Sequence, residues 1–399
     1  MNKELVEIID YLERPGRPDA VLATVINVEG SSYRLPGARM LIAEGSWRTV
    51  GNVSGGCLEA DVIERAQKVL RTGRPEVLTY DTRNDLESVF SLNMGCRGVV
   101  TILLERPSER FTRFIKKRLK TRRPGVIATC ITSGEGDNAE IGSQAFIDED
   151  AVSAPEIADV TVAAISSAAL AVLREGRSGR LETSFGDFFL EFIPAPTDLL
   201  VFGAGADAVP VADLAKRMGW RVTVVDHRPA FATRERFPVA DEVLLSTVEQ
   251  LAADLRIENS TATIVMTHNY QRDREILKFL LGSRAFYIGA LGPKKRTERI
   301  LDELKTEELR VTPEDLERLY APIGLDIGGG TPELIALSII AEIQTVRTGR
   351  TGGFLRERKG SINNRRETSM QQSWRVLSIT NGNGGGVLVS PVDAARERA

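Results

Sequence analysis

The fold of the second half of this chain is decided by one stretch, Leu199-Leu200-Val201-Phe202-Gly203-Ala204-Gly205-Ala206-Asp207-Ala208. Its apolar start predicts a buried strand, its two glycines predict a tight turn, and a helix follows. Gly203 and Gly205 also permit a ligand to approach the backbone closely, and the small Ala208 lets the helix pack on the strand. Unpaired amide groups at such a helix start favour an anion, normally a pyrophosphate.

A second apolar strand, residues 221–226, follows the helix and ends in Asp226. An acid about 20 residues after the glycine turn is where dinucleotide-binding folds place the acceptor of a ribose hydroxyl. The order of strand, glycine turn, helix, strand and acid therefore predicts a nucleotide-type site, with Gly203, Gly205 and Asp226 as binding residues.

Strands and helices keep alternating after this point, which predicts a Rossmann-like, doubly wound parallel sheet over residues 194–350. The stiff segment Pro194-Ala195-Pro196-Thr197 predicts the domain boundary. Residues 1–193 mix helices and strands in an order that predicts an α+β domain. Residues 351–399 are rich in Arg, Gly, Ser, Asn and Gln, so we expect a disordered tail, with one short strand or docking segment at 374–379.

Hydrophobic periodicity predicts the individual elements. The expected strands lie at 20–28, 38–43, 48–53, 76–80, 99–105, 125–131 and 188–193 in the first domain, and at 199–202, 221–226, 242–245, 262–266 and 285–288 in the second. The expected helices lie at 3–13, from Leu58 to about Arg71, before Gly125, and at 154–174, 207–218, 248–255, 271–282, 294–304 and 332–347.

The composition is that of a globular protein of two domains, with 399 residues of which 42% are hydrophobic and 27% charged. A net charge of −3 provides no basic field for nucleic acid, and no apolar run is long enough to cross a bilayer. The first residues lack the apolar region of a signal peptide, so we expect a cytoplasmic protein. Three cysteines and two histidines are too few for a disulfide framework or a closed structural zinc site.

Two cysteines stand in glycine turns of the first domain. Cys57 follows two glycines and is expected to start a helix, whose dipole favours the thiolate. Cys96 follows a glycine and precedes Arg97. Each is either a reactive thiol on a loop or a small filler of a tight turn. Cys130 lies inside an apolar strand, and we expect an inert, packed thiol.

Several residues are expected at the carboxyl ends of the Rossmann strands, where ligands bind in open α/β sheets. His227 and His268 each follow such a strand. A histidine there is either a ligand-binding group or a side chain bonded to a backbone carbonyl; we favour the second interpretation for His227, and both stay open for His268. Gly292 and Lys294 belong to a third turn, where successive cations begin a helix. This turn suits a phosphate or another anion, or it is a solvated basic face.

These motifs together resemble the XdhC/CoxI family of accessory proteins for xanthine dehydrogenase and related molybdenum hydroxylases. In the first half the resemblance rests on Gly-Ser-Ser-Tyr-Arg-Leu-Pro-Gly-Ala at 30–38 and Ser-Gly-Gly-Cys-Leu-Glu at 54–59. In the second half it rests on the stretches at 201–205, 225–229, 267–270, 288–292 and 322–328. It covers residues 1 to about 350.

The resemblance implies a protein that binds the molybdenum cofactor (molybdopterin), assists its sulfuration by a cysteine desulfurase and hands it to a xanthine dehydrogenase-type hydroxylase. It makes Cys57 and Cys96 candidates for holding the molybdenum, and we expect the pterin phosphate at a glycine turn such as Gly203 to Gly205. The expected cofactor site is completed by Asp226, His268, Gly292 and Lys294. No nucleic acid or membrane partner is expected, and a homodimer is left open.

Two positions depart from the family pattern. Ala206 replaces the histidine that often follows Gly-Ala-Gly, which weakens the case for a metal at the Rossmann turn, and Arg97 replaces the glycine after the second cysteine. An NAD-dependent oxidoreductase is the alternative, because of Gly203, Gly205 and Asp226, although no acid–base motif such as Tyr-x-x-x-Lys accompanies them. A third interpretation is a scaffold for desulfurase and hydroxylase with a vestigial nucleotide site.

Overall fold

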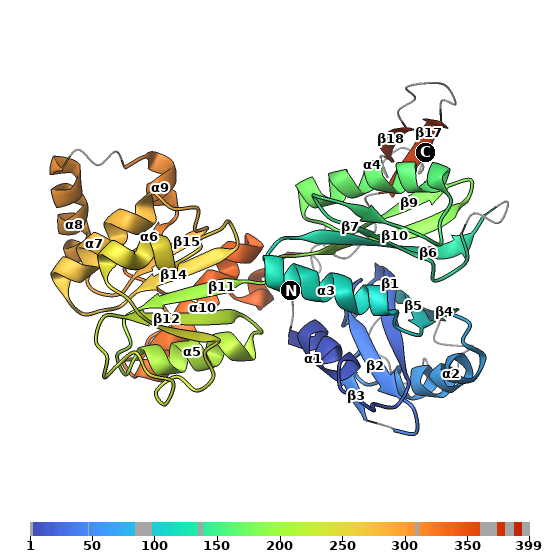
Figure 1. The fold of residues 1–399 in the computed structure, drawn as a ribbon, viewed down its shortest axis with the longest axis horizontal. Coiled ribbons are helices and arrows are strands. Elements are labelled where there is room, and N and C mark those ends of the chain that lie inside the picture. Colours follow the sequence, from blue (N-terminus) through green and yellow to red (C-terminus); the bar gives the residue numbers. More distant parts are fainter. Residues whose placement is uncertain are drawn as a thin grey trace. The chain divides into compact units, whose positions relative to one another are not determined.

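The computed structural model describes residues 3–46, 48–83, 98–134, 139–307, 311–359, 373–379 and 387–392. They form two compact units. The Rossmann unit is Pro196–Glu357 together with Lys3, and the N-terminal unit is Glu4–Ala195 together with the chain from Arg358 onward. Each unit has sheets and a hydrophobic core of its own (Figure 1). The division between Ala195 and Pro196 falls inside the proline-rich segment, close to the boundary expected at 193/194.

The Rossmann unit is built on sheet C, whose six strands are all paired parallel in the order β13-β12-β11-β14-β15-β16. The strands are β11 (Asp198–Phe202), β12 (Arg221–Asp226), β13 (Glu242–Leu245), β14 (Thr261–Val265), β15 (Tyr287–Ala290) and β16 (Leu319–Tyr320). The chain winds outward from β11 in one direction and then returns to β14 on its other side. This is the doubly wound, Rossmann-like sheet that the sequence predicts, and the prediction is confirmed.

Helices cover both faces of sheet C, because the strands are apolar on both faces. The helices α5 (Ala208–Arg217) and α10 (Pro332–Thr348) pack on the face that carries Leu199 and Val201. On the face that carries Leu200 and Phe202 lie α6 (Leu251–Asp254), α7 (Tyr270–Leu281) and α8 (Lys294–Thr306). Shorter elements are η2 (Val248–Gln250), α9 (Pro313–Glu317) and η3 (Leu355–Glu357). With both faces covered, the carboxyl edge of sheet C is where a ligand can approach (Figure 1).

The N-terminal unit contains two sheets. Sheet A has the order β3-β2-β1-β5-β4 and is covered by α2, and sheet B has the order β18-β17-β9-β10-β6-β7-β8 and is covered by α4. The part of the chain that contains sheet A runs through α1 (Lys3–Leu12), β1 (Ala20–Gly30), β2 (Arg39–Ala43), β3 (Thr49–Gly51), α2 (Glu59–Thr72), β4 (Glu76–Asp81) and β5 (Gly98–Glu105). The part that contains sheet B includes α3 (Glu109–Thr121), β6 (Gly125–Ser133), β7 (Gln144–Ile147), β8 (Val152–Ser153), α4 (Asp159–Glu175), β9 (Gly179–Thr183), β10 (Gly186–Ile193), β17 (Ser373–Ile379) and β18 (Val387–Val392). The predicted mixed α+β character is confirmed.

Sheet B contains strands that the periodicity of the sequence does not predict. β7, β8 and β9 are short, and their pairing with β6, β10 and one another is what defines them. β17 pairs parallel with β9 and matches the short strand expected at 374–379, whereas β18, which pairs with β17, lies in a part of the segment 351–399 that we expected to be disordered. The reason is physical: the edge of β9 has unpaired backbone groups that the tail can bind, and the sequence of the tail contains no sign of that edge. Among the helices of the described ranges, none combines the length and the apolar character needed to cross a bilayer.

Candidate functional site

The glycine turn at 203–207 lies where β11 ends, next to the end of β14. Gly203 has a φ of +113°, and a Cβ at this residue would lie 2.5 Å from the carbonyl oxygen of Met266, so the turn requires glycine. Gly205 is different, because a Cβ at this residue would meet no atom within 4 Å. The turn is therefore fixed on its inner side and open on its outer side.

Three amide groups of this turn are available to a ligand. The N–H groups of Gly205, Ala206 and Asp207 have no hydrogen-bond partner within the part of the chain that the structure describes. They directly precede α5, where the helix dipole adds a partial positive charge. Amide groups in this arrangement bind phosphate and other anions. We refer to these three amides as the amide cradle.

The carboxylate of Asp226 is hydrogen-bonded within the protein and leaves no acceptor for a ligand. Its Oδ2 accepts hydrogen bonds from the amide of Ala204 and from Arg228 Nη2, both at 2.7 Å, and its Oδ1 accepts two more from Arg228 at 2.9 Å. Burial acts to raise the pKa of Asp226, but the hydrogen bonds from Arg228 and Ala204 outweigh it and hold the pKa at about 2. The predicted ribose-binding role of Asp226, and with it the NAD alternative, is not supported, because the carboxylate is already saturated. Asp226 instead ties the turn to β12.

Two arginines stack on the ring of Phe231 beside the turn. The guanidinium carbon of Arg228 lies 3.8 Å from the ring centroid, and that of Arg236 lies 5.0 Å from it. Arg236 also donates from Nη2 to the carbonyl oxygen of Ala204 at 3.3 Å, and its buried Nε has no partner in the described ranges. The charge of Arg228 is balanced by Asp226, whereas Arg236 has no carboxylate partner among the described residues and places a positive charge next to the amide cradle, where it favours an anion.

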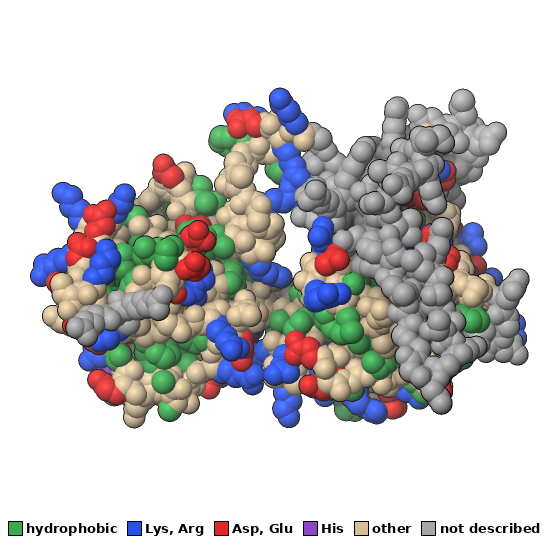
Figure 2. Space-filling view, turned by 90° about the horizontal axis from the view of Figure 1, so that it is seen from above, with side chains coloured by type: hydrophobic (Ala, Val, Ile, Leu, Met, Phe, Trp, Pro, Cys, Tyr) green, Lys and Arg blue, Asp and Glu red, His purple; other side chains and the backbone are tan. Residues whose placement is uncertain are grey.

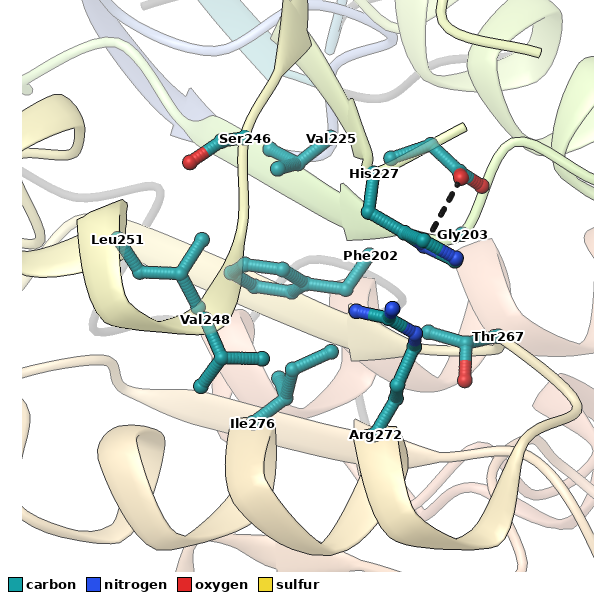
Figure 3. Close-up of a pocket in the computed structure, with 11 residues that line it drawn as sticks. Phe202, Gly203, Val225, His227, Ser246, Val248, Leu251, Thr267, Arg272 and Ile276 are labelled. Atoms are coloured by element: carbon teal, nitrogen blue, oxygen red, sulfur yellow. Dashed lines mark ion pairs between the residues drawn. The ribbon is translucent and has the colours of Figure 1, made fainter. Parts of the chain in front are cut away.

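A small pocket opens at the same edge, between the ends of β11, β12 and β14 and the start of α7 (Figure 3). Its apolar wall consists of Phe202, Val248, Leu251 and Ile276. His227, Thr267 and Arg272 line its polar side (Figure 3). The pocket encloses about 20 Å³, which is room for about one water molecule. A nucleotide base or a pterin ring therefore enters it only if these side chains move.

His227 faces a carboxylate rather than a backbone carbonyl. Its Nδ1 lies 3.3 Å from Asp226 Oδ1, in the contact that Figure 3 marks with a dashed line. Burial lowers the pKa of His227, and the positive charge of Arg272 lowers it further, against the opposing effect of Asp226. Near pH 7 the ring is therefore neutral, so Arg272 provides the positive charge of this pocket.

His268 lies beside the amide cradle in a strained conformation. Its φ is +59°, in the left-handed region that a residue with a side chain rarely adopts. The ring is 59% exposed, and its Nε2 lies 3.1 Å from Asp207 Oδ2, at the residue that precedes α5. Strain of this kind gathers at functional sites, so the structure places His268 where the sequence analysis expected a binding residue.

The turn at Gly292 is joined to this edge through Arg296 rather than Lys294. Arg296 pairs with the buried Asp273, which accepts a hydrogen bond from the hydroxyl of Thr267. Burial raises the pKa of Asp273, although its hydrogen bonds to Thr267 and the charge of Arg296 act in the opposite direction. Lys294 is 74% exposed and lies 3.9 Å from Glu298, one helical turn further on. The interpretation of Lys294 as a solvated cation fits this placement better than a binding role.

Cys57 belongs to a loop that is organised by Ser54. The hydroxyl oxygen of Ser54 accepts hydrogen bonds from the amides of Gly56, Cys57 and Leu58 at 3.1 to 3.2 Å, and its own proton is donated to Glu59. The exposed thiol of Cys57 lies 3.6 Å from the same oxygen. Burial acts to raise the pKa of Glu59, but its bonds to Ser54 outweigh this and lower it. The thiol is thus presented at the surface on a defined loop.

Cys96 lies outside the described residues, so its distance from Cys57 stays a prediction. The described residues around both loops do share one end of sheet A. Gly98, at the start of β5, pairs with Gly30 at the end of β1. Thr82, directly after β4, holds the end of β4 at the same place, because its hydroxyl donates to the carbonyl of Gly98 at 2.8 Å. Gly51, at the end of β3, pairs with Met40 near the start of β2. The Cys57 loop therefore leaves sheet A at the same end as the chain that leads to Cys96.

The third cysteine, Cys130, is packed inside the N-terminal unit. Cys130 is buried in β6, and burial raises the pKa of its thiol to about 11, which confirms the expected packed and unreactive cysteine. Within the described ranges, no three His, Cys, Asp or Glu side chains are grouped in a way that could hold a metal ion.

The structure therefore divides the predicted site residues between two places. Those at the carboxyl edge of sheet C are Gly203, Gly205, Asp226, His268, Gly292 and Lys294. Cys57 lies in the N-terminal unit. Arg228, Arg236 and Arg272 are the site residues that the sequence analysis missed. Arg272 had a usable signal, because it lies in the first turn of a helix, where the dipole normally favours acidic side chains.

Comparison with known proteins identifies relatives over both units. The XdhC Rossmann domain matches residues 199–343, and the XdhC and CoxI family matches residues 14–81. A protein of Bacillus subtilis (strain 168), named as a probable subunit of xanthine dehydrogenase, is 32% identical over 333 residues, which are 82% of this chain and 93% of the relative. The molybdenum cofactor insertion chaperone PaoD of Escherichia coli (strain K12) is 25% identical over 329 residues, 82% of this chain and 83% of PaoD.

A solved structure agrees with these relatives. The crystal structure of a protein from Bacillus halodurans, described as a xanthine dehydrogenase, is 31% identical to this chain and superposes with a TM-score of 0.69. The similarity covers 87% of this chain and 96% of that one. Since relatives align across both units and the two family matches follow one another in order, this chain belongs to the XdhC/CoxI family.

Proposed function

We propose that this chain binds the molybdenum cofactor and delivers it to a molybdenum hydroxylase of the xanthine dehydrogenase type. The observation that carries the proposal is the amide cradle at Gly205, Ala206 and Asp207, flanked by Arg228 and Arg236. The names of the relatives support the choice of ligand and of recipient, because one is a cofactor insertion chaperone and another is named for xanthine dehydrogenase.

The cradle suits the phosphate group of molybdopterin. The three amides donate hydrogen bonds, Arg236 adds charge, and the space outside Gly205 is open. His268 is held at the same turn by Asp207, so its exposed ring lies on the rim of the site. Because no acceptor carboxylate is free at Asp226, the site recognises an anion better than a ribose.

From the family resemblance, we propose Cys57 and Cys96 as the candidate molybdenum ligands of this chain. The exposed Cys57 thiol on its Ser54-organised loop is the kind of group that can ligate a soft metal centre. The cofactor itself supplies the oxo and sulfido chemistry when it is bound. The part of this chain is to hold and shield the cofactor, so the protein acts without turnover of its own.

Finer parts of the proposal rest on the family resemblance. We propose that a cysteine desulfurase assists sulfuration of the cofactor while it is held here, and that the protein works in the cytoplasm. Co-purification with the desulfurase from cells that also produce the hydroxylase tests the first of these.

Retention of pterin tests the main proposal. The full chain is purified from cells that make molybdenum cofactor, and bound pterin is measured as its fluorescent oxidation product. Wild type should retain pterin, and Gly205→Asp should reduce retention at least tenfold, because a carboxylate repels the phosphate from the cradle. Gly353→Asp is the matched control, because Gly353 is an exposed glycine of the same unit outside the cradle, where a Cβ would meet only Thr351 Oγ1, at 3.6 Å; this variant should retain most of the pterin.

Cys57→Ala tests the proposed role of the cysteine independently of the amide cradle. It should retain pterin but lose molybdenum from the bound fraction, as measured by metal analysis. Absence of pterin from the wild-type chain, or equal retention by wild type and Gly205→Asp, contradicts the proposal.

A further inference from the structure

The helix α3 carries a concentration of positive charge on the N-terminal unit. Six of its 13 residues are Lys or Arg, and one is acidic. The chain as a whole has a net charge of −3, and on the face drawn in Figure 2 basic and acidic side chains are interspersed. A helix with this excess of cations therefore departs from the rest of the surface and calls for a reason.

The buried side of α3 fixes the helix in place. Phe111, Phe114 and Ile115 face the interior, and the buried Arg118 pairs with Asp148 at 2.6 Å and stacks on Phe114. Arg118 is thus used for structure. The other cations of the helix are exposed, on a backbone that is held rigidly.

A hollow of about 160 Å³ lies between α3 and the β7–β8 hairpin. Its floor is apolar, formed by Phe114, Phe146 and Ala151, and the rings of Phe114 and Phe146 lie 5.3 Å apart. Its rim is formed by Arg110, Arg113 and Lys117. These three residues are spaced three and four apart, so they form one stripe along the helix. The hollow thus combines an apolar floor with a cationic rim.

Arg113 is the cation of this rim that has no ionic partner in the described part of the chain. Arg110 pairs with Glu156 and Lys117 with Asp148, both at 2.8 Å, whereas no carboxylate lies within 4.0 Å of the Arg113 guanidinium. Arg113 also borders a second hollow of about 350 Å³, between α3 and the end of α1, together with Lys116. An unpaired cation between two hollows is placed to receive a carboxylate from outside.

We propose that this face of α3 binds an extended acidic segment of a partner protein, with an apolar side chain of that segment seated on Phe114 and Phe146. The cations give charge complementarity, and the apolar floor gives an anchor of the kind found at protein interfaces. A helix of 13 residues is about 20 Å long, the length of about six extended residues. The proposal is independent of the amide cradle, which lies in the other unit.

The same face is poorly suited to nucleic acid. Glu13, Glu156 and Asp148 pair with three of its cations, so the face lacks the continuous row of free cations that a phosphate backbone needs. The apolar floor also gives a sugar–phosphate backbone nothing to bind. A protein segment can instead alternate carboxylates with an apolar residue and match both features.

Fluorescence polarisation with the full chain tests this inference. The probe is a fluorescein-labelled peptide, Glu-Ser-Glu-Phe-Glu-Ser-Glu, and a second peptide carries Ser in place of Phe. The Phe peptide should bind more tightly than the Ser peptide, and its affinity should fall with added salt. Arg113→Glu should weaken binding of the Phe peptide at least tenfold, and Ala151→Glu, which puts a carboxylate on the floor, should do the same.

Arg74→Glu is the matched control, since Arg74 is an exposed arginine of the same unit that does not line either hollow. It should change the affinity less than twofold. Circular dichroism on all variants checks that the fold is retained, which is expected because each change is at an exposed residue. The inference is overturned if the Phe peptide does not bind, if Arg74→Glu weakens binding as much as Arg113→Glu, or if a fluorescein-labelled oligothymidine binds α3 in place of the peptide.

Discussion

At the scale of single residues, the most instructive position is Asp226. It occurs where Rossmann folds place the acceptor of a ribose hydroxyl, yet its carboxylate is 1% exposed and is satisfied by Arg228 and the amide of Ala204. The acid therefore holds the glycine turn and directs Arg228 onto Phe231. A position that selects a nucleotide in other Rossmann proteins here holds the turn and its stacked arginine in place.

Asp226→Asn tests this structural role. We expect the variant to lose about 2 kcal/mol of unfolding free energy at pH 7, less than the 3–5 kcal/mol usual for a broken buried pair because the Arg228 guanidinium can reach water. The folded pKa of Asp226 is about 2, below its ordinary value of 3.8. The carboxylate therefore stabilises the fold fully above about pH 4, and this contribution is lost as the pH falls toward 2.

Urea unfolding of wild type and Asp226→Asn between pH 3 and 8 measures the difference in their unfolding free energies. It should be constant from about pH 5 to 8 and shrink at lower pH. Glu242→Gln, which alters an exposed pair with Arg221, is the control and should cost less than about 0.5 kcal/mol. If Asp226→Asn costs as little unfolding free energy as the control, then the bonds of Asp226 to Arg228 and to the Ala204 amide do not stabilise the fold.

At the scale of residues, the sequence predicts a position correctly where the backbone conformation there allows only one residue type. Gly203 was identifiable because a positive φ next to the backbone of Met266 admits only glycine. The partners of Asp226 were not identifiable in the same way. Which of the available hydrogen-bond donors reaches a carboxylate depends on side-chain directions, and Phe231 and Arg236 reach the turn from a loop that has no periodic pattern.

At the scale of elements, the loop before α2 shows how one hydroxyl can organise a presented thiol. Ser54 accepts from three successive amides and donates to Glu59, so four polar groups of the loop depend on it. The loop also contacts its neighbour, because the ring of Tyr33 lies against Gly55, 3.5 Å from where a Cβ would be. Cys57 is thus held at the surface by hydrogen bonds and by packing.

Ser54→Ala should loosen this loop without unfolding the unit. Loss of the hydroxyl acceptor costs about 1 kcal/mol, so the amides of Gly56, Cys57 and Leu58 should exchange with solvent about fivefold faster. Hydrogen exchange followed by NMR or mass spectrometry measures this. Ser46→Ala is the matched control, because the Ser46 hydroxyl accepts from one amide, that of Arg48. Unchanged exchange at residues 56–58 in Ser54→Ala would contradict the assigned role.

Elements were predictable in proportion to their length and burial. Five of the six strands of sheet C are short but largely apolar and alternate with helices, so their pattern identifies them; β16, with two half-buried residues, leaves no such pattern. In sheet B, β8 has two exposed residues, and β9 gains its partners from β10 and from β17, which lies far along the chain. Pairing between strands that are far apart in the sequence leaves no periodic pattern in either strand. For the same reason, the sequence of the tail does not show which strand it pairs with.

At the scale of the whole molecule, the N-terminal unit joins its two sheets through a buried polar cluster. Arg39 on β2 of sheet A forms a bidentate pair with Glu191 on β10 of sheet B. Glu105 on β5 lies close by and accepts a hydrogen bond from Gln144 Nε2 of β7 at 3.0 Å. Apolar residues of both sheets, among them Leu103 and Phe189, surround the cluster. One arginine therefore faces two buried carboxyl groups.

This arrangement makes the stability of the N-terminal unit depend on pH. Burial raises the pKa of Glu105 to about 8; Arg39 opposes the rise and Glu191 adds to it. In the unfolded chain the pKa is near its ordinary value of 4.5. The neutral carboxyl group therefore supports the fold fully below about pH 4.5, and the support is lost as the pH rises to about 8, at up to about 1.4 kcal/mol per pH unit.

Glu105→Gln should remove this dependence, because the amide matches the shape of the neutral acid and does not ionise. We expect the melting temperature of the variant, taken relative to wild type at the same pH, to rise steadily from pH 5 to 8 and to level off above pH 8. Glu140→Gln, at an exposed glutamate of the same unit, should show a constant difference. A Glu105→Gln difference that also stays constant would mean that Glu105 ionises in the folded unit as it does in water, and that Arg39 neutralises both carboxylates between the two sheets.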